Sequence, residues 1–246
     1  MSMGVQLGDF SWHQISERLQ TDCRLVLPLG ATEQHGDLSL ETDSRTAEAA
    51  CQAACKRSGL IMAPVLPFGA SAFSVNFPGT VSLRTATISA VIEDMIDGFY
   101  RQGFRRLIFV TGHGGNEVIT GTISEAMLDR PQLAIHYVSV YGCMADEVAA
   151  VEQGLGAIHP GDHASWYEAL PFNRVGPIHQ QDERIDFDAD FPEFPLNPRL
   201  ARARLGKGVL SGRTTAPDAA IERVWRTAID NLCACFAKMP PEPPEA

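Results

Sequence analysis

The chain has 246 residues, 45% of them hydrophobic, and its 30 acidic and 20 basic residues give a formal net charge of −10. That length suits one well-packed core, so we expect a single domain over residues 1–240 and a flexible tail at 241–246. The acidic balance argues against nucleic acid or an anionic membrane as a partner, because both present phosphate groups that an acidic surface repels.

The sequence carries no signal for a membrane or for secretion. No apolar run approaches the roughly 18 residues of a transmembrane helix, and the opening MSMGVQLGDFSWHQ lacks the basic and apolar regions of a secretory signal. The six cysteines include no CxxC pair, so we expect free thiols in a reducing compartment. The composition therefore predicts a cytoplasmic protein.

Apolar runs alternate with amphipathic segments along the chain. Strands are expected at residues 24–29 (RLVLPL), 60–66 (LIMAPVL), 106–111 (RLIFVT) and 134–141 (AIHYVSVY). Helices are expected at residues 44–57, from Thr87 to a stop at Gly103, after residue 116 to about 128, and at 218–238. The stretch GDHASWYEAL at 161–170 is expected to begin another helix. The alternation predicts an α/β fold with helices on both faces of the sheet.

Residues 181–198 (QDERIDFDADFPEFPLNP) depart from this alternation. The segment concentrates acidic residues and prolines, a composition that suits a surface excursion better than a core element. We expect it to form a lid or an arm that contacts a neighbouring subunit.

Polar side chains cluster directly after the first predicted strand. Glu33 and His35 lie two positions apart, so in an extended chain they project to the same side. Asp43 follows at the expected start of the next helix, and carboxylate and imidazole together suit Zn²⁺, Mn²⁺ or Fe²⁺. The alternative is that Asp43 or Ser44 caps the helix and that Glu33 and His35 belong to a solvated loop.

A second polar cluster, TGHGGN at 111–116, follows the third predicted strand. Its glycines leave His113 uncovered, so the ring can reach a ligand while the backbone turns sharply. One alternative is a tight turn whose backbone amides hold an anion. Another is a dinucleotide-binding loop, although Glu117 stands where the third glycine of that motif would be.

A third cluster, GDHASWYE at 161–168, supplies His163 and Glu168, for which a helix cap or a core histidine is the alternative. In α/β sheets, ligand sites form outside the carboxyl ends of the strands, where the first two clusters fall. Together the three clusters provide ligands for two divalent cations that share one carboxylate. Burying so many carboxylates without cations would be costly.

Four motifs in order resemble the creatininase (creatinine amidohydrolase) superfamily. They are LPLGATEQHGDLSLETDSRTAEA, FPGTVSL, TGHGGN and GDHASWYE, and the resemblance covers about residues 25–170. The mycofactocin precursor peptidases and the formamidopyrimidine deformylases also resemble this superfamily. The resemblance implies a three-layer α/β/α sandwich with a mostly parallel central sheet, a site for two divalent ions (zinc, manganese or iron) and assembly as a homohexamer.

The resemblance also implies a role for each polar residue. The metal ligands would be Glu33 and His113 for one ion, His35 and Glu168 for the other, and Asp43 bridging both. His163 would be the catalytic histidine. The turn of Gly114, Gly115 and Asn116 could donate a hydrogen bond to the charge that develops on the substrate. Further candidates for substrate contact, each with a plain loop or packing role as the alternative, are Ser71, Ser74, Asn76 and Trp166.

The pocket residues depart from those of creatininase itself. Creatininase has a tyrosine–glutamate pair where this chain has Gly114 and Gly115, and a tryptophan where this chain has His159. Many relatives carry a histidine in the loop before FPGT, where this chain reads SAFSVN. We therefore expect a small-molecule, amide-type substrate other than creatinine.

The resemblance predicts a hydrolase of a C–N bond in an amide, a cyclic amide or a formamide. A hydroxide bridging the two cations would attack the carbonyl, since such ions pull the pKa of water from about 15.7 towards 7. His163 would act as general acid and base for the leaving nitrogen. The alternatives are metal-assisted ring opening of a keto-cyclitol on the same scaffold, or a non-catalytic, oligomeric protein that binds an anion.

Overall fold

The computed structural model describes residues 5–157, 159–184 and 197–242. A parallel sheet of three strands lies at its centre, with β1 (Arg24–Leu29), β2 (Arg106–Thr111) and β3 (Ala134–Ser139) side by side in that order. All three match predicted strands, and β3 ends two positions before the predicted boundary at residue 141. Leu29 pairs with Thr111, so β1 and β2 end at the same level.

The predicted strand at 60–66 lies beside β1 but does not form a continuous strand. It makes isolated parallel bridges at Met62 and Leu66. Between them stands Pro64, which has no backbone N–H to donate to a ladder. The segment therefore protects the edge of the sheet without counting as a regular strand.

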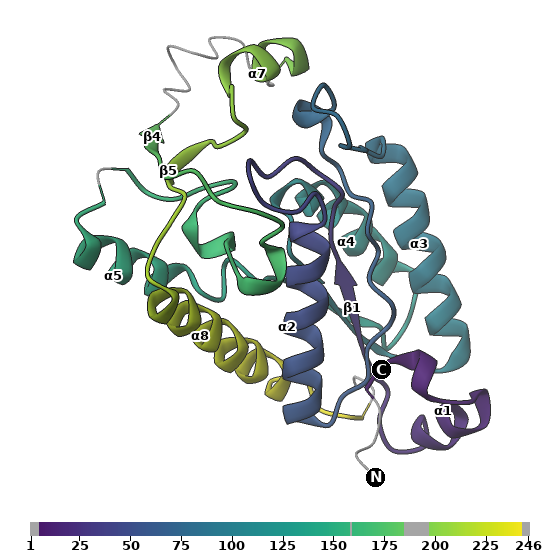
Figure 1. The fold of residues 1–246 in the computed structure, drawn as a ribbon. Coiled ribbons are helices and arrows are strands. Elements are labelled where there is room, and N and C mark those ends of the chain that lie inside the picture. Colours follow the sequence, from purple (N-terminus) through teal and green to yellow (C-terminus); the bar gives the residue numbers. More distant parts are fainter. Residues whose placement is uncertain (1–4, 158, 185–196, 243–246) are drawn as a thin grey trace.

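Helices cover both faces of the sheet (Figure 1). Those packed on one face are α2 (Thr42–Ser58), α5 (Ala145–Leu155) and α8 (Asp218–Ala237), and those on the other are α3 (Thr85–Gln102) and α4 (Thr120–Leu128). Two shorter helices are α1 (Trp12–Arg18) and α7 (Pro198–Arg204). The predicted three-layer α/β/α fold is confirmed, whereas α1, α5 and α7 were not predicted as helices.

Alternate residues of each central strand face opposite cores. In β1, Leu25 and Leu27 pack against the α3 and α4 side, while Val26 packs against the α2 and α8 side. In β2, Phe109 and Ile108 divide in the same way. Beyond their first residues β1 and β2 are buried on both faces and almost wholly apolar, which is why they could be predicted from the sequence, whereas β3 is only partly buried.

Two predicted surface segments fall partly outside the described residues. Of the acidic segment 181–198, residues 185–196 are not described. The flanks form a short antiparallel pair, β4 (Asp182–Arg184) with β5 (Ser211–Arg213), and the start of α7, where the side chain of Asn197 accepts from two backbone amides. Of the predicted tail, Pro241 accepts a hydrogen bond from the backbone of Cys23, while residues 243–246 are not described.

All six cysteines are free thiols, as the sequence predicts. Within the described residues, none of the helices combines the length and the apolar character that a bilayer span requires.

Candidate metal centre

The candidate centre lies just beyond the ends of β1 and β2, where the amino terminus of α2 meets them. Close packing at this point depends on glycine. A Cβ on Gly112 would lie 2.3 Å from the backbone oxygen of Asp43, and a Cβ on Gly30 would lie 2.4 Å from the Cα of Ser44. The bare backbone at these two positions lets α2 approach the strand ends and places Asp43 over them.

Asp43 lies between two histidines and directs one carboxylate oxygen to each. Its Oδ1 is 3.0 Å from Nε2 of His35, and its Oδ2 is 2.9 Å from Nδ1 of His113. Glu33 joins the second pair, with Oε2 3.2 Å from the same His113 nitrogen, and Glu168 joins the first, with Oε1 3.9 Å from His35. The result is two trios that share one aspartate, and the ligand atoms within each trio lie within 4.8 Å of one another.

The hydrogen bonds assign a tautomer to each histidine. Nδ1 of His35 is 3.1 Å from the backbone oxygen of Glu33, and Nε2 of His113 is 3.0 Å from that of Ala70. A carbonyl oxygen only accepts, so each of these nitrogens carries the proton. In the neutral rings the other nitrogen then presents its lone pair to an oxygen of Asp43, a tautomer that suits a metal ligand.

Lone pairs that face each other at about 3 Å need a positive charge between them. Nε2 of His35 and Oδ2 of Asp43 are buried and have no hydrogen-bond partner among the described residues. Glu33 is fully buried, and Asp43 and Glu168 are 2% and 3% exposed, so water cannot solvate these carboxylates. The donor set therefore fits either two cations or two extra protons.

If protons rather than cations balance the carboxylates, the pKa values show that the histidines carry them. Burial disfavours the charged form of His35, but Asp43 and Glu168 outweigh it and raise its pKa to about 10. Burial likewise opposes the charge on His113, but Asp43 and Glu33 raise that pKa to about 9. The pKa of Asp43 lies well below its usual range, because both histidines outweigh the effect of burial.

Two serines hold the carboxylate of Glu33. Ser74 donates to Oε1 at 2.5 Å and Ser71 donates to Oε2 at 2.9 Å, and both serines are fully buried. Their hydroxyls therefore orient a candidate metal ligand.

Glu168 reaches the centre from a tight turn, not from the helix expected at 161–170. The regular part is a three-residue 3₁₀ turn, Trp166–Glu168. The backbone N–H of Ala164 donates to the Glu168 carboxylate at 2.5 Å, and Ala164 itself has a positive φ of 64°. The left-handed backbone of Ala164 is incompatible with a continuous α-helix, and Pro171 removes a later donor. Burial raises the pKa of Glu168 to about 7.

His163 lies beside the centre without belonging to either trio. Its ring centroid is 4.2 Å from that of His35, and its Nε2 is 2.7 Å from the backbone oxygen of Gln34. Burial and the charge of His35 lower the pKa of His163 to about 4, so the ring is neutral at neutral pH. The structure thus brings together all six residues that the sequence proposed for the metals and for proton transfer.

Two proposed substrate contacts lie in the scaffold. Trp166 is fully buried in the core, and its indole N–H donates to Glu152 at 3.0 Å. Asn116 is 1% exposed, donates to the backbone oxygen of Gly30 and accepts from the backbone of Ala70. Both side chains connect segments around the centre, which is a packing role in this structure.

The other proposed contacts differ in how open they are. Asn76 is exposed in the loop after Ser74. A Cβ on Gly114 would meet nothing within 4 Å, so there is open space at that position. A Cβ on Gly115 would lie 2.1 Å from the backbone oxygen of Ala70 and 2.4 Å from the His113 ring. Gly115 thus permits the turn to close on His113, while Gly114 leaves room beside it.

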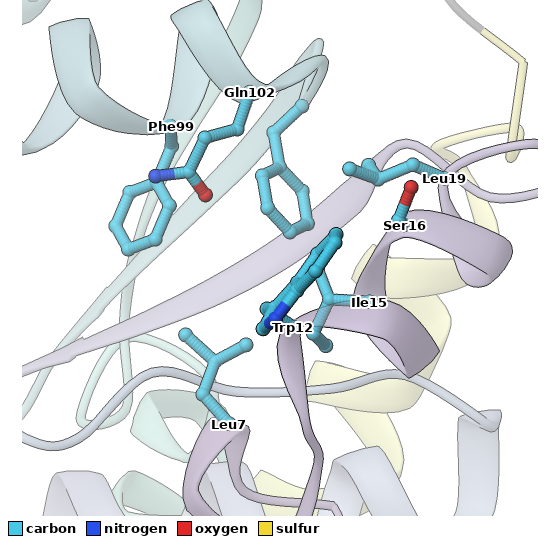
Figure 2. Close-up of a pocket in the computed structure, with 8 residues that line it drawn as sticks. Leu7, Trp12, Ile15, Ser16, Leu19, Phe99 and Gln102 are labelled. Carbon is cyan, nitrogen blue, oxygen red and sulfur yellow. The ribbon is translucent and has the colours of Figure 1, made fainter.

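A cavity of about 400 Å³ between α1 and α3 lies elsewhere in the fold (Figure 2). Its lining is largely apolar and includes Trp12, Ile15, Phe99 and Phe104. No acidic, basic or histidine side chain lines it. The lining of this cavity therefore offers none of the carboxylate or imidazole groups found in the candidate centre.

The fold and the site together define the class of this protein. It is a three-layer α/β protein with a candidate metal centre at the carboxyl edge of its sheet, formed by two trios of carboxylate and imidazole groups. Residues 8–236 match the family described as creatininase, creatinine amidohydrolase. The chain belongs to the creatininase family and is a hydrolase of that family.

The relatives differ in how much of their length the match covers. Creatinine amidohydrolase of Pseudomonas putida is 35% identical over 125 residues, which is 48% of each chain. The chain thus spans about half the length of that relative. Mycofactocin precursor peptide peptidase of Mycobacterium tuberculosis is 28% identical over 256 aligned positions, which cover 96% of this chain and 94% of the relative.

Solved creatininase structures share the fold over nearly their whole length. A structure described as "Creatininase Mn" has a TM-score of 0.81 and 26% identity, covering 97% of this chain and 100% of the other. A creatininase mutant described as "Zn-Zn type" has a TM-score of 0.81 and 25% identity, covering 97% and 99%.

Proposed function

We propose that this protein is a metal-dependent hydrolase of a C–N bond and that it holds two divalent cations. The observation that carries the proposal is the pair of ring nitrogens, on His35 and His113, that face the two oxygens of Asp43 while the other nitrogen of each ring contacts a backbone carbonyl. Glu33 would complete the site of one ion and Glu168 that of the other. The manganese and zinc named for the two creatininase structures support a divalent metal.

The mixed nitrogen and oxygen ligands suit zinc, manganese or iron. When bound, such ions would lower the pKa of a water towards 7 and polarise a carbonyl. The protein's own contribution is to keep these groups in place and dry. Ser71 and Ser74 fix the carboxylate of Glu33, and backbone carbonyls fix both histidine rings.

His163 is the group that we propose for proton transfer. Amide nitrogen is a poor leaving group and needs a proton as the C–N bond breaks. His163 lies beside His35 but outside both trios, so a ring nitrogen is free for this purpose. Burial and the charge on His35 hold the pKa of His163 low, so the neutral ring would take a proton from the attacking water before passing one to the leaving nitrogen.

The substitution His163→Ala tests this role. We expect the variant to keep its metal and to lose about 100- to 10,000-fold in kcat, the usual contribution of a general acid or base. The exposed His136 on β3 provides a matched control, because His136→Ala should change neither quantity. Wild-type kcat in His163→Ala would refute the assignment.

The substrate class follows from the space at Gly114 and from the relatives. In sequence, a relative matched over 94% of its length is named for a peptide substrate, whereas the creatinine enzyme of Pseudomonas putida is matched over 48%, although solved creatininases share the fold over nearly their whole length. We therefore favour an amide, a cyclic amide or a formamide other than creatinine. A panel of these compounds, with creatinine and a keto-cyclitol, should show metal-dependent turnover of an amide-type member. Turnover of the cyclitol alone would instead establish ring opening.

The creatininase resemblance further suggests a homohexamer, and sedimentation or light scattering of the purified protein tests that assembly. A subunit mass alone would contradict it.

The remaining alternative is an anion-binding protein without catalysis. Such a protein requires no cation, so elemental analysis separates it from the proposal.

A further inference from the structure

The side chain of Gln34 joins the metal-ligand loop to a distant segment of the chain. It is 6% exposed, although its neighbours Glu33 and His35 face the centre. Its Oε1 accepts from the backbone N–H of Gly36 at 3.1 Å, and its Nε2 donates to the backbone oxygen of Gly208 at 3.0 Å. These two bonds fix which end of the amide is oxygen and which is nitrogen.

Gln34 also contacts His163 twice through a single ring nitrogen. Nε2 of His163 is 2.7 Å from the backbone oxygen of Gln34 and 2.9 Å from its side-chain nitrogen. The backbone oxygen only accepts, so Nε2 carries the proton and donates to it. The side-chain amide lies against the same ring nitrogen and limits where the ring can move, which leaves Nδ1 for the substrate.

The segment around Gly208 packs directly against the side chain of Gln34. Gly208 has φ of +87°, and a Cβ there would lie 1.8 Å from Oε1 of Gln34. Two residues on, the backbone N–H of Leu210 donates to the backbone oxygen of His163 at 3.1 Å. Gln34, His163 and the segment from Leu205 to Leu210 therefore form one connected unit.

We propose that Gln34 is a positioning residue that fixes the ring of His163 and couples the 205–210 segment to the centre. The inference rests on the proposed function only in giving His163 a catalytic role, because the contacts exist without it. Sequence reasoning missed Gln34, since alternation along an extended chain points it away from Glu33 and His35.

The first test replaces Gln34 with methionine, which matches its length and neither donates nor accepts. We expect kcat of Gln34→Met to fall about 10- to 100-fold, as for other residues that orient a catalytic side chain. Metal content and KM should stay near wild type, because no metal ligand is removed. A purely structural role would lower the amount of folded protein and leave the kcat of the folded fraction unchanged.

The second test disturbs the same contact from the other side. Gly208→Ala should displace the Gln34 amide and lower kcat, but it should add little when combined with Gln34→Met. Gly59, which follows α2, is a matched control outside this segment, because it also has a positive φ, of 68°, and a Cβ there would meet nothing within 4 Å. Gly59→Ala should therefore keep wild-type kcat.

Amide hydrogen exchange at Leu210 tests the contact independently of any activity assay. Exchange should be faster in Gln34→Met and in Gly208→Ala than in wild type, whichever reaction the enzyme catalyses. Unchanged exchange, or a double variant whose losses in kcat simply multiply, would overturn the inference. Faster exchange in a protein without metal-dependent turnover would uphold the contact and reject the proposed function, so the two failures are distinguishable.

Discussion

At the scale of single residues, the centre depends on Asp43, whose two oxygens serve different histidines. Asp43→Asn keeps the shape but replaces one oxygen with an amide nitrogen that cannot bind a cation. We expect the variant to lose most of its metal and all measurable activity, as should Asp43→Ala. Elemental analysis with an activity assay measures both.

The exposed Asp146 at the start of α5 is the control, and Asp146→Asn should retain metal and activity. An Asp43→Asn variant that still binds a full complement of cations would contradict the bridging role.

Metal binding at this centre should release protons. In the metal-free protein the pKa values of His35 and His113, about 10 and about 9, keep both rings protonated at neutral pH. A cation must displace these protons, so affinity should rise with pH by up to about tenfold per unit for each proton released. Titration calorimetry in buffers of different ionisation enthalpy counts them. Binding without proton release at pH 7 would show that the histidines are not ligands.

The sequence named the polar residues of the centre but not all of the side chains that support them. Glu33, His35 and Asp43 could be found because they lie close together after one strand. The hydroxyls that orient Glu33 come from Ser71 and Ser74, in a loop whose path no local pattern predicts. Gly208, the partner of Gln34, is farther still along the chain.

At the scale of elements, the approach of α2 to the strand ends is the feature on which the geometry depends. Gly112→Ala would place a methyl group 2.3 Å from the backbone oxygen of Asp43. Because backbone atoms on both sides must then move, we expect a loss of about 1–3 kcal/mol in the free energy of unfolding. Denaturant unfolding of the metal-free protein measures it.

Gly98 within α3 is the matched control, since a Cβ there would meet nothing within 4 Å. Alanine has the higher helix propensity, so Gly98→Ala should stabilise the protein by up to about 1 kcal/mol. Equal effects of the two substitutions would show that Gly112 is not a close-packing position.

An element could be predicted where the pattern of apolar residues along the chain reflects its burial, and not where its structure depends on tertiary contacts. Beyond their first residues, the strands β1 and β2 are buried on both faces and almost wholly apolar, so they were predicted well. The segment at 60–66 carries the same apolar signal, but Pro64 interrupts its hydrogen bonding. The turn at Trp166–Glu168 was mistaken for a helix because the bond between Glu168 and Ala164 depends on the tertiary position of the glutamate.

At the scale of the whole molecule, two hydrophobic cores enclose one sheet and leave its carboxyl edge for polar groups. The register of β1 with β2 brings the chain after Leu29 beside the chain after Thr111. Residues far apart in the sequence therefore meet in one buried cluster, whose carboxylates need positive charge to balance them. The α/β class and a shared polar site at the strand ends could be predicted from the residues alone, whereas the place of each ligand in the two trios required the family resemblance.

The most direct test of this account is the metal content of the protein as purified without chelator. Elemental analysis should find about two divalent cations per chain, one for each trio of ligands. Their removal should abolish hydrolysis of the amide-type substrate, and their return should restore it. A protein that takes up no zinc, manganese or iron would contradict the central claim that the buried carboxylates and histidines form a metal centre.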